Sequence, residues 1–215
     1  MVDLIDSYDE TNHDNWVTLA AIHPTADVPL SGVGQSFTMI AAARKIVSCK
    51  FYLKQVGNPG IMNAVLYDHA GVYGTSSVPS GAALGTSNDV DASGIGGNFI
   101  LVTFSFAGAQ QYLMTANANY CIVVQATSGD WDAVNNNVLV SQDISAPSHS
   151  GNRMVYQSSA WAPKDTRDII FYVYGEAAGG PSLKRMLMGV GLMAKTPKFE
   201  ARKVCPFKCP LPLFK

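Results

Sequence analysis

The sequence predicts an all-β protein: an antiparallel two-sheet β-sandwich, jelly-roll-like, followed by an extended C-terminal arm. Short runs of alternating apolar and polar residues, typical of half-buried strands, recur along the chain. Between them stand many turn-forming residues, among them 19 Gly and 11 Pro. The chain is 47% hydrophobic and only 14% charged, so it can bury a substantial core. These observations favour about eight strands and no helix in the body.

The stretch from residue 46 to residue 67 shows the pattern most clearly. One face of the predicted strand 46–54 should be buried, and it carries Val47, Cys49, Phe51 and Leu53. The opposite face carries Ser48, Lys50, Tyr52 and Lys54. The sequence GNPG at residues 57–60 then forces a turn. A second strand follows at 61–67, and the two form a hairpin or a pair that crosses between sheets.

The remaining elements follow in order. Residues 1–29 are expected to form an irregular arm that ends in one short strand. Residues 68–93 are expected to form a long loop of small side chains. Phe37 should point inward from the strand at 34–39. The run FILVTFSF at 99–106 is apolar on both faces, which favours a central strand. The strands 111–114 and 119–126 are expected to pair with each other through a turn at 116–118, and two further strands are predicted at 137–142 and 169–176.

Composition changes at Gly179-Gly180-Pro181, where we place the boundary between a body, residues 1–178, and a basic, Pro-rich arm, residues 179–215. The body carries 7 Lys or Arg against 15 Asp or Glu, a net charge of −8, whereas the arm carries 8 against 1, a net charge of +7. An acidic body with a basic arm predicts that the arm binds an acidic surface.

The arm also contains apolar residues that have no core of their own to enter. Four of them recur at helical spacing, and from residue 195 onward prolines rule out a regular helix. We expect the arm to lie in a groove on another subunit, and its predicted contact residues are Leu183, Met186, Leu187, Val190, Phe199, Arg202, Lys203, Phe207, Leu211 and Phe214.

Several strings in the body carry a resemblance: DSY at 6–8, GQSF at 34–37, residues 49–93, APSHSGN at 146–152 and FYVYGE at 171–176. Together they resemble the β-sandwich domains grouped as choice-of-anchor R, over most of residues 6–176. The resemblance implies a sandwich displayed on a surface and joined to an attachment device, which here would be the C-terminal arm. It brings no catalytic motif with it.

Candidate chemistry is sparse in the sequence. His13, His23, His69 and His149 are scattered outside any catalytic motif, so we expect no enzyme activity and no cofactor. Asp130 and Asp132 are candidate calcium ligands, although turn formation explains them without a metal.

The four cysteines form two pairs. Cys49 and Cys121 read as buried free thiols. Cys205 and Cys209 supply only two of the four ligands of a structural zinc site, so zinc would need help from another chain.

Tryptophans raise the alternative of glycan binding. Trp131 and Trp161 lie in polar contexts that could expose a ring to a sugar, or each could cap the hydrophobic core. Nucleic-acid contact by the arm would be nonspecific and salt-sensitive, so we expect no specific nucleic-acid partner.

The resemblance extends to surface proteins and to phage or virus structural proteins. Together with the division of charge and the lack of a catalytic motif, it implies a non-enzymatic structural protein of a virion. A capsid decoration or cement protein fits best, with a tail or fibre component second and a carbohydrate-binding or adhesion module as the competing class. The expected partners are other copies of the chain or a major capsid or tail protein, in a homo-oligomer. The acidic N-terminus does not resemble a secretory signal, and no apolar run is long enough to span a bilayer. The expected location is the virion, with an extracellular surface as the alternative.

Overall fold

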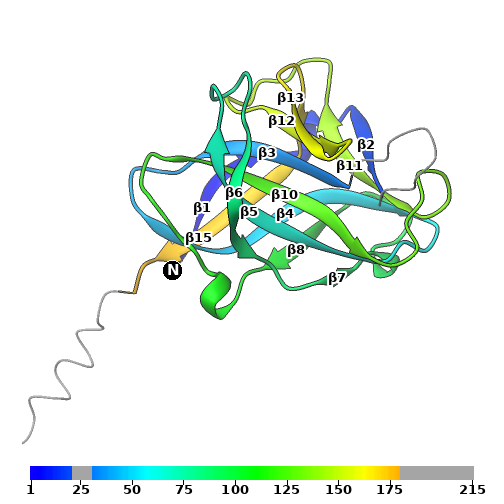
Figure 1. Ribbon diagram of the computed structural model, residues 1–215, viewed down its shortest axis with the longest axis horizontal. Coiled ribbons are helices and arrows are strands. Elements are labelled where there is room, and N and C mark those ends of the chain that lie inside the picture. The colour runs from blue at the N-terminus through cyan, green and yellow to red at the C-terminus, as the bar shows by residue number, and fades with distance from the viewer. Residues whose placement is uncertain (21–30, 180–215) are drawn as a thin grey trace, which may run out of the picture. The chain divides into compact units, whose positions relative to one another are not determined.

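Two antiparallel β-sheets make up the body, and the computed structural model describes residues 1–20 and 31–179 (Figure 1). The predicted all-β two-sheet sandwich is confirmed. The helical elements in the described residues are three single 3₁₀ turns: η1 Glu10–Asn12, η2 Ala92–Gly94 and η3 Gly108–Gln110. None of the helices in the described ranges has the length and hydropathy that crossing a membrane would require.

The first sheet, called sheet A, is built around the long strand β4 (Arg44–Val56). β15 and β8 pair with β4 on opposite sides, because residues 48–51 have partners in both strands. All pairings in this sheet are antiparallel. Its other strands are β1 (Val2–Tyr8), β2 (Asn15–Leu19), β8 (Ile100–Ser105), β9 (Leu113–Met114), β11 (Asn137–Asp143), β14 (Asp168–Ile169) and β15 (Phe171–Ala177).

The second sheet, called sheet B, has the strand order β13-β12-β3-β10-β5-β6, with the short β7 paired to β5. β13 and β6 are the strands at the two ends of this order. They contact each other, so the sheet is strongly curled. Its strands are β3 (Gly32–Thr38), β5 (Ile61–Ala70), β6 (Val78–Thr86), β7 (Val90–Asp91), β10 (Asn119–Ser128), β12 (Arg153–Gln157) and β13 (Ala160–Lys164).

Alternate residues of both sheets fill one core between them. Phe37 is fully buried, as predicted, and so are Phe51, Phe104 and Phe171. Phe51 and Phe104 meet edge to face with ring centroids 5.9 Å apart, a favoured aromatic geometry. The turn at residues 57–60 carries the chain from β4 in sheet A to β5 in sheet B, so the pair crosses between sheets.

The buried face of β4 differs from the prediction at one end. Cys49, Phe51 and Leu53 are buried as expected, but Ile46 is buried in place of Val47. The pairing with β15 shifts there, because Tyr174 faces Ser48 whereas Gly175 faces Ile46. The extra residue is a β-bulge, which exchanges the inward and outward positions beyond it.

Two segments expected to be irregular form strands. Residues 2–8 form β1, which pairs with β15 over its whole length. Within the predicted loop 68–93, β6 and β7 pair with β5. Edge pairing orders these segments through backbone hydrogen bonds, which side-chain periodicity does not report.

The prediction of a central strand at residues 99–106 is wrong. Among the described strands, β8 pairs only with β4, and Ile100 is 44% exposed. The outward Phe99 instead packs beside His13 and Tyr52, with ring centroids 4.7 and 5.4 Å away. The predicted pairing of 111–114 with 119–126 is also wrong, because β9 pairs with β4 and β10 with β3 and β5.

Candidate functional site

A cavity of about 500 Å³ lies on the outer, concave face of sheet B. β10 and the start of β3 line its floor through Gln125 and Gly32, and β6 and β13 line its sides through Gly81 and Trp161. Figure 1 shows β6 and the β12–β13 hairpin on the same side of β3 and β10. The curl of the sheet therefore shapes the cavity, whose volume falls in the range of small-molecule sites, roughly 300–1,000 Å³.

Three aromatic side chains gather in this cavity. The ring centroid of Trp161 lies 5.1 Å from that of Tyr156 and 6.3 Å from that of Tyr67, both edge to face. All three rings are half-buried. Strand alternation explains the cluster, because the neighbouring residues Leu66 and Val155 point into the core and leave Tyr67 and Tyr156 on the outer face.

The indole of Trp161 lies close against the backbone of Gly32 in β3. A Cβ on Gly32 would lie 3.1 Å from the Cη2 atom of Trp161. The absent side chain lets the indole lie directly on β3, so the floor of the cavity is backbone at this point.

The polar groups of the cavity are neutral. Among the described residues, no group forms a hydrogen bond with the side-chain amide of Gln125 or with the phenol groups of Tyr67 and Tyr156. Burial, and then the nearby Tyr156, raise the pKa of Tyr67, so this phenol keeps its proton well into the alkaline range. The lining residues that the structure describes include no acidic or basic side chain.

Trp131 does not contribute to this cavity. Its side chain is 4% exposed and belongs to the core, and its indole N–H donates to the carbonyl oxygen of Ser128 over 3.0 Å. The alternative in which Trp131 caps the core is the one that the structure supports, because a buried ring has no free face for a ligand. Trp161, the other predicted glycan contact, does line the cavity.

Asp130 and Asp132 lie in the turn between β10 and β11. The carboxylate of Asp132 accepts backbone N–H groups from Val134 over 2.8 Å and from Asn135 over 2.6 Å. This is the turn-forming role that Asp commonly has. In the ranges 1–20 and 31–179, no group of three or more His, Cys, Asp or Glu side chains is arranged to hold a metal.

The described histidines lie in three separate places. The ring of His13 bonds the hydroxyl of Ser141 over 2.7 Å, and that of His69 bonds Ser77 over 2.9 Å. Ser141 and Ser77 are both fully buried, which keeps their hydroxyls away from a substrate in solution. His23 lies outside the described residues.

His149 belongs to a polar network at one end of the sandwich. Its Nδ1 accepts from the backbone N–H of Gly151 over 3.0 Å, which leaves Nε2 to donate to Asp6 over 3.3 Å. Its own backbone N–H donates to Asp168 over 2.9 Å, and Gln35 donates to the same carboxylate over 2.7 Å. Burial of the carboxylate raises the pKa of Asp168.

Neighbouring residues extend this network. The hydroxyl of Tyr8 donates to Asp143 over 2.6 Å, and the backbone N–H of Asn152 donates to Ser36 over 2.8 Å. The strings DSY, GQSF and APSHSGN, which lie far apart in the sequence, therefore meet here. The contacts are internal, so this cluster acts to hold the sheets and the loop at 144–152 together.

The prediction of two buried free thiols is confirmed for Cys49 and Cys121. Burial raises the pKa of both thiols well above the usual range, so neither is a reactive thiolate at neutral pH. Cys205, Cys209 and every predicted contact residue of the arm, from Leu183 to Phe214, lie outside the described residues.

No family model matches the chain, and no curated protein matches it.

Sequence reasoning found Trp161 but missed Tyr67, Gln125 and Tyr156. The sequence held a partial signal for Tyr156 alone, since MVYQ and AWAPK flank the dipeptide Ser158-Ser159. Both serines have positive φ angles, 51° and 63°, as a two-residue hairpin turn requires. Serine is not the usual residue for that backbone, which is why the β12–β13 hairpin was not predicted.

Proposed function

We propose that this protein is a non-enzymatic structural component of a virion, in which the sandwich is displayed and the arm at residues 179–215 attaches it to a neighbouring subunit. A capsid decoration or cement protein is the favoured form, and a tail or fibre component the second. The partner is another copy of the chain or a major capsid or tail protein. The location is the virion, with an extracellular surface as the alternative.

The observation that carries the proposal is the division of charge. The net charge of −8 on residues 1–178 and +7 on residues 179–215 favours attraction between the arm of one copy and the body of another. The arm combines this charge with Phe199, Phe207, Leu211 and Phe214. Apolar side chains in a basic segment add burial to electrostatic attraction, which suits a lasting contact.

The body has properties that suit a displayed module. Its core is continuous between the two sheets, and its buried polar groups are largely bonded to one another. The resemblance to choice-of-anchor R domains supports the same role, because it implies a surface sandwich joined to an attachment device. The described histidines and cysteines are used inside the fold.

Transfer of the arm to another protein tests the proposal. Residues 179–215 would be fused to a monomeric fluorescent protein and titrated with the body, residues 1–178, at low and moderate salt. We expect saturable binding that weakens as salt screens the charges. Deleting residues 181–215 from the full chain should leave a folded body that no longer co-purifies with assembled particles.

Two variants of the fused arm separate the contribution of charge to binding from that of apolar burial. Arg202→Gln with Lys203→Gln should reduce the salt dependence, whereas Phe207→Ser with Phe214→Ser should weaken binding at every salt concentration. Normal incorporation of the truncated chain into particles would contradict the proposal.

A further inference from the structure

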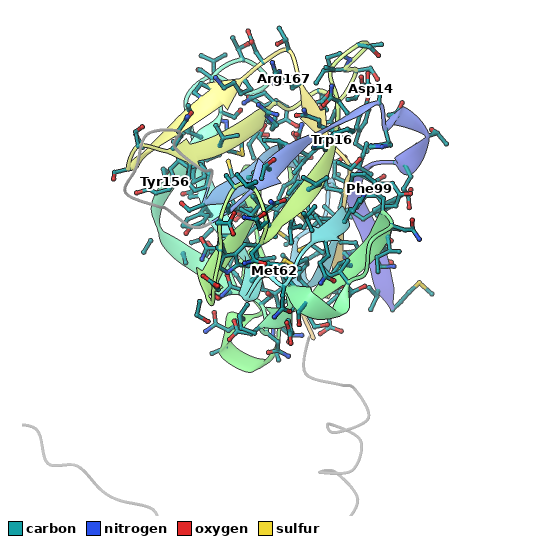
Figure 2. All side chains as sticks on the ribbon, turned by 90° about the vertical axis from the view of Figure 1, so that its right-hand side faces the viewer. Asp14, Trp16, Met62, Phe99, Tyr156 and Arg167 are labelled. Carbon is teal, nitrogen blue, oxygen red and sulfur yellow. The ribbon has the colours of Figure 1, made fainter. Side chains whose placement is uncertain are left out.

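The cavity on sheet B has features that internal packing does not account for. It is lined by three rings and a primary amide, yet its polar side chains have few partners in the described structure. By contrast, the polar network around His149 is closely bonded. Figure 2 places Tyr156 well away from Trp16, the exposed tryptophan of β2 in sheet A.

The chemistry of the lining restricts the ligand. Within the ranges 1–20 and 31–179, the lining residues offer no cation for a phosphate, sulfate or carboxylate and no carboxylate for a metal or an amine. What they offer is ring faces and edges from Trp161, Tyr156 and Tyr67, together with neutral hydrogen-bonding groups. A matching ligand is uncharged, has an apolar face, and carries hydroxyl groups around its rim.

The geometry of the rings agrees with such a ligand. Because Trp161 meets both tyrosines edge to face, the three rings form an angled wall and not a closed stack. Gln125 lies half-buried on the floor, where its amide can both donate and accept. A pyranose ring has C–H groups on one face and hydroxyl groups at its edge, which matches an aromatic wall beside a neutral polar floor.

We propose that the cavity lined by Tyr67, Gln125, Tyr156 and Trp161 is a binding site for a neutral, hexose-containing glycan. These four residues all belong to the body, residues 1–178. Trp161 supplies the main stacking surface, and Gln125 and the two phenols select hydroxyl positions. Trp131 takes no part.

The test uses the full-length chain on an array that holds neutral, sialylated and sulfated glycans, followed by calorimetric titration with the neutral glycans that bind. We expect binding to neutral glycans at one site per chain. Trp161→Ala should weaken it about tenfold or more, since it removes the stacking surface. Trp16→Ala, which removes an exposed tryptophan from sheet A, should leave binding unchanged.

Conservative variants distinguish a loss of binding from a loss of folding. Tyr156→Phe removes only a hydroxyl group and should weaken binding severalfold, whereas the matched Tyr52→Phe, a half-buried tyrosine of sheet A, should not. Thermal unfolding of each variant shows whether it is folded. Absence of any neutral ligand, preference for charged glycans alone, or undiminished binding by a folded Trp161→Ala protein would each overturn the proposal.

Discussion

The side-chain amide of Gln35 donates to the carboxylate of Asp168 over 2.7 Å, and this bond joins the two sheets. Gln35 lies on β3 of sheet B, and Asp168 lies on β14 of sheet A. The carbonyl oxygen of the same amide accepts the backbone N–H of Ile169 over 3.1 Å. Both residues are buried, so one glutamine provides a donor and an acceptor where water is excluded.

Replacing this glutamine should be costly. Gln35→Leu removes one of the two hydrogen-bond donors to the buried carboxylate of Asp168 and the acceptor of the Ile169 N–H, and we expect a loss of about 2–4 kcal/mol in the free energy of unfolding. Chemical denaturation would measure it. Gln157→Leu, at the exposed end of β12, is the matched control and should change stability by less than about 0.5 kcal/mol. Equal effects of the two variants would mean that the bond does not stabilise the sandwich.

The turn that crosses between the sheets depends on Gly57. Its φ angle is +66°, and a Cβ there would lie 1.7 Å from the carbonyl oxygen of Asn135. Gly57→Ala should therefore destabilise the fold by more than about 1 kcal/mol. Gly97→Ala is the control, because no atom lies within 4 Å of its Cβ position and its φ is not in the left-handed region. A neutral Gly57→Ala variant in denaturation experiments would contradict this account of the turn.

Trp131 and Trp16 should respond differently to truncation. Trp131 is 4% exposed and Trp16 is 51% exposed. Trp131→Ala opens a cavity in the core and should cost about 3–5 kcal/mol, whereas Trp16→Ala should have a small effect. Thermal unfolding measures both. If the two losses are similar, the burial assigned to Trp131 is wrong.

Acid should weaken the fold partly through His69. Burial lowers the pKa of this histidine from its usual value of 6.5. The unfolded chain then binds the proton more readily than the folded one, so the contribution of His69 is fully present above pH 6.5 and declines as the pH falls through the lower folded value.

The matched variant for this effect is His69→Gln, which keeps a hydrogen-bonding group near Ser77 but does not titrate. Between neutral pH and pH about 5, its denaturation midpoint should fall less than that of the unmodified protein. Parallel decline of the two proteins would show that His69 does not contribute to acid sensitivity.

The sequence predicted the sandwich because apolar runs of strand length, one of them clearly alternating, are separated by turn-forming residues. The runs at 46–54, 61–67 and 119–126 all correspond to strands. Side-chain period gives no information about which strand pairs with which, so the positions of β8 and β9 were predicted wrongly. The bulge at Val47 was not predicted for a related reason, because it arises from the pairing register between β4 and β15.

The candidate site was less predictable. Trp131 and Trp161 stand in similar polar contexts in the sequence, yet one is buried and the other lines a cavity. What separates them is tertiary: Trp161 lies on the outer side of a curled sheet whose end strands approach each other. Tyr67 and Tyr156 contact Trp161 from strands β5 and β12, which are far apart in the chain. No local sequence pattern indicates that these three rings lie together.

The measurement that tests the central claim most directly is the mass in solution, by light scattering, of the full-length protein and of residues 1–178, each at low and at moderate salt. Attachment through the arm predicts that the full-length protein forms a defined oligomer, that added salt shifts it toward smaller species, and that the truncated body is a monomer throughout. Monomers for both proteins at both salt concentrations would contradict self-assembly through the arm.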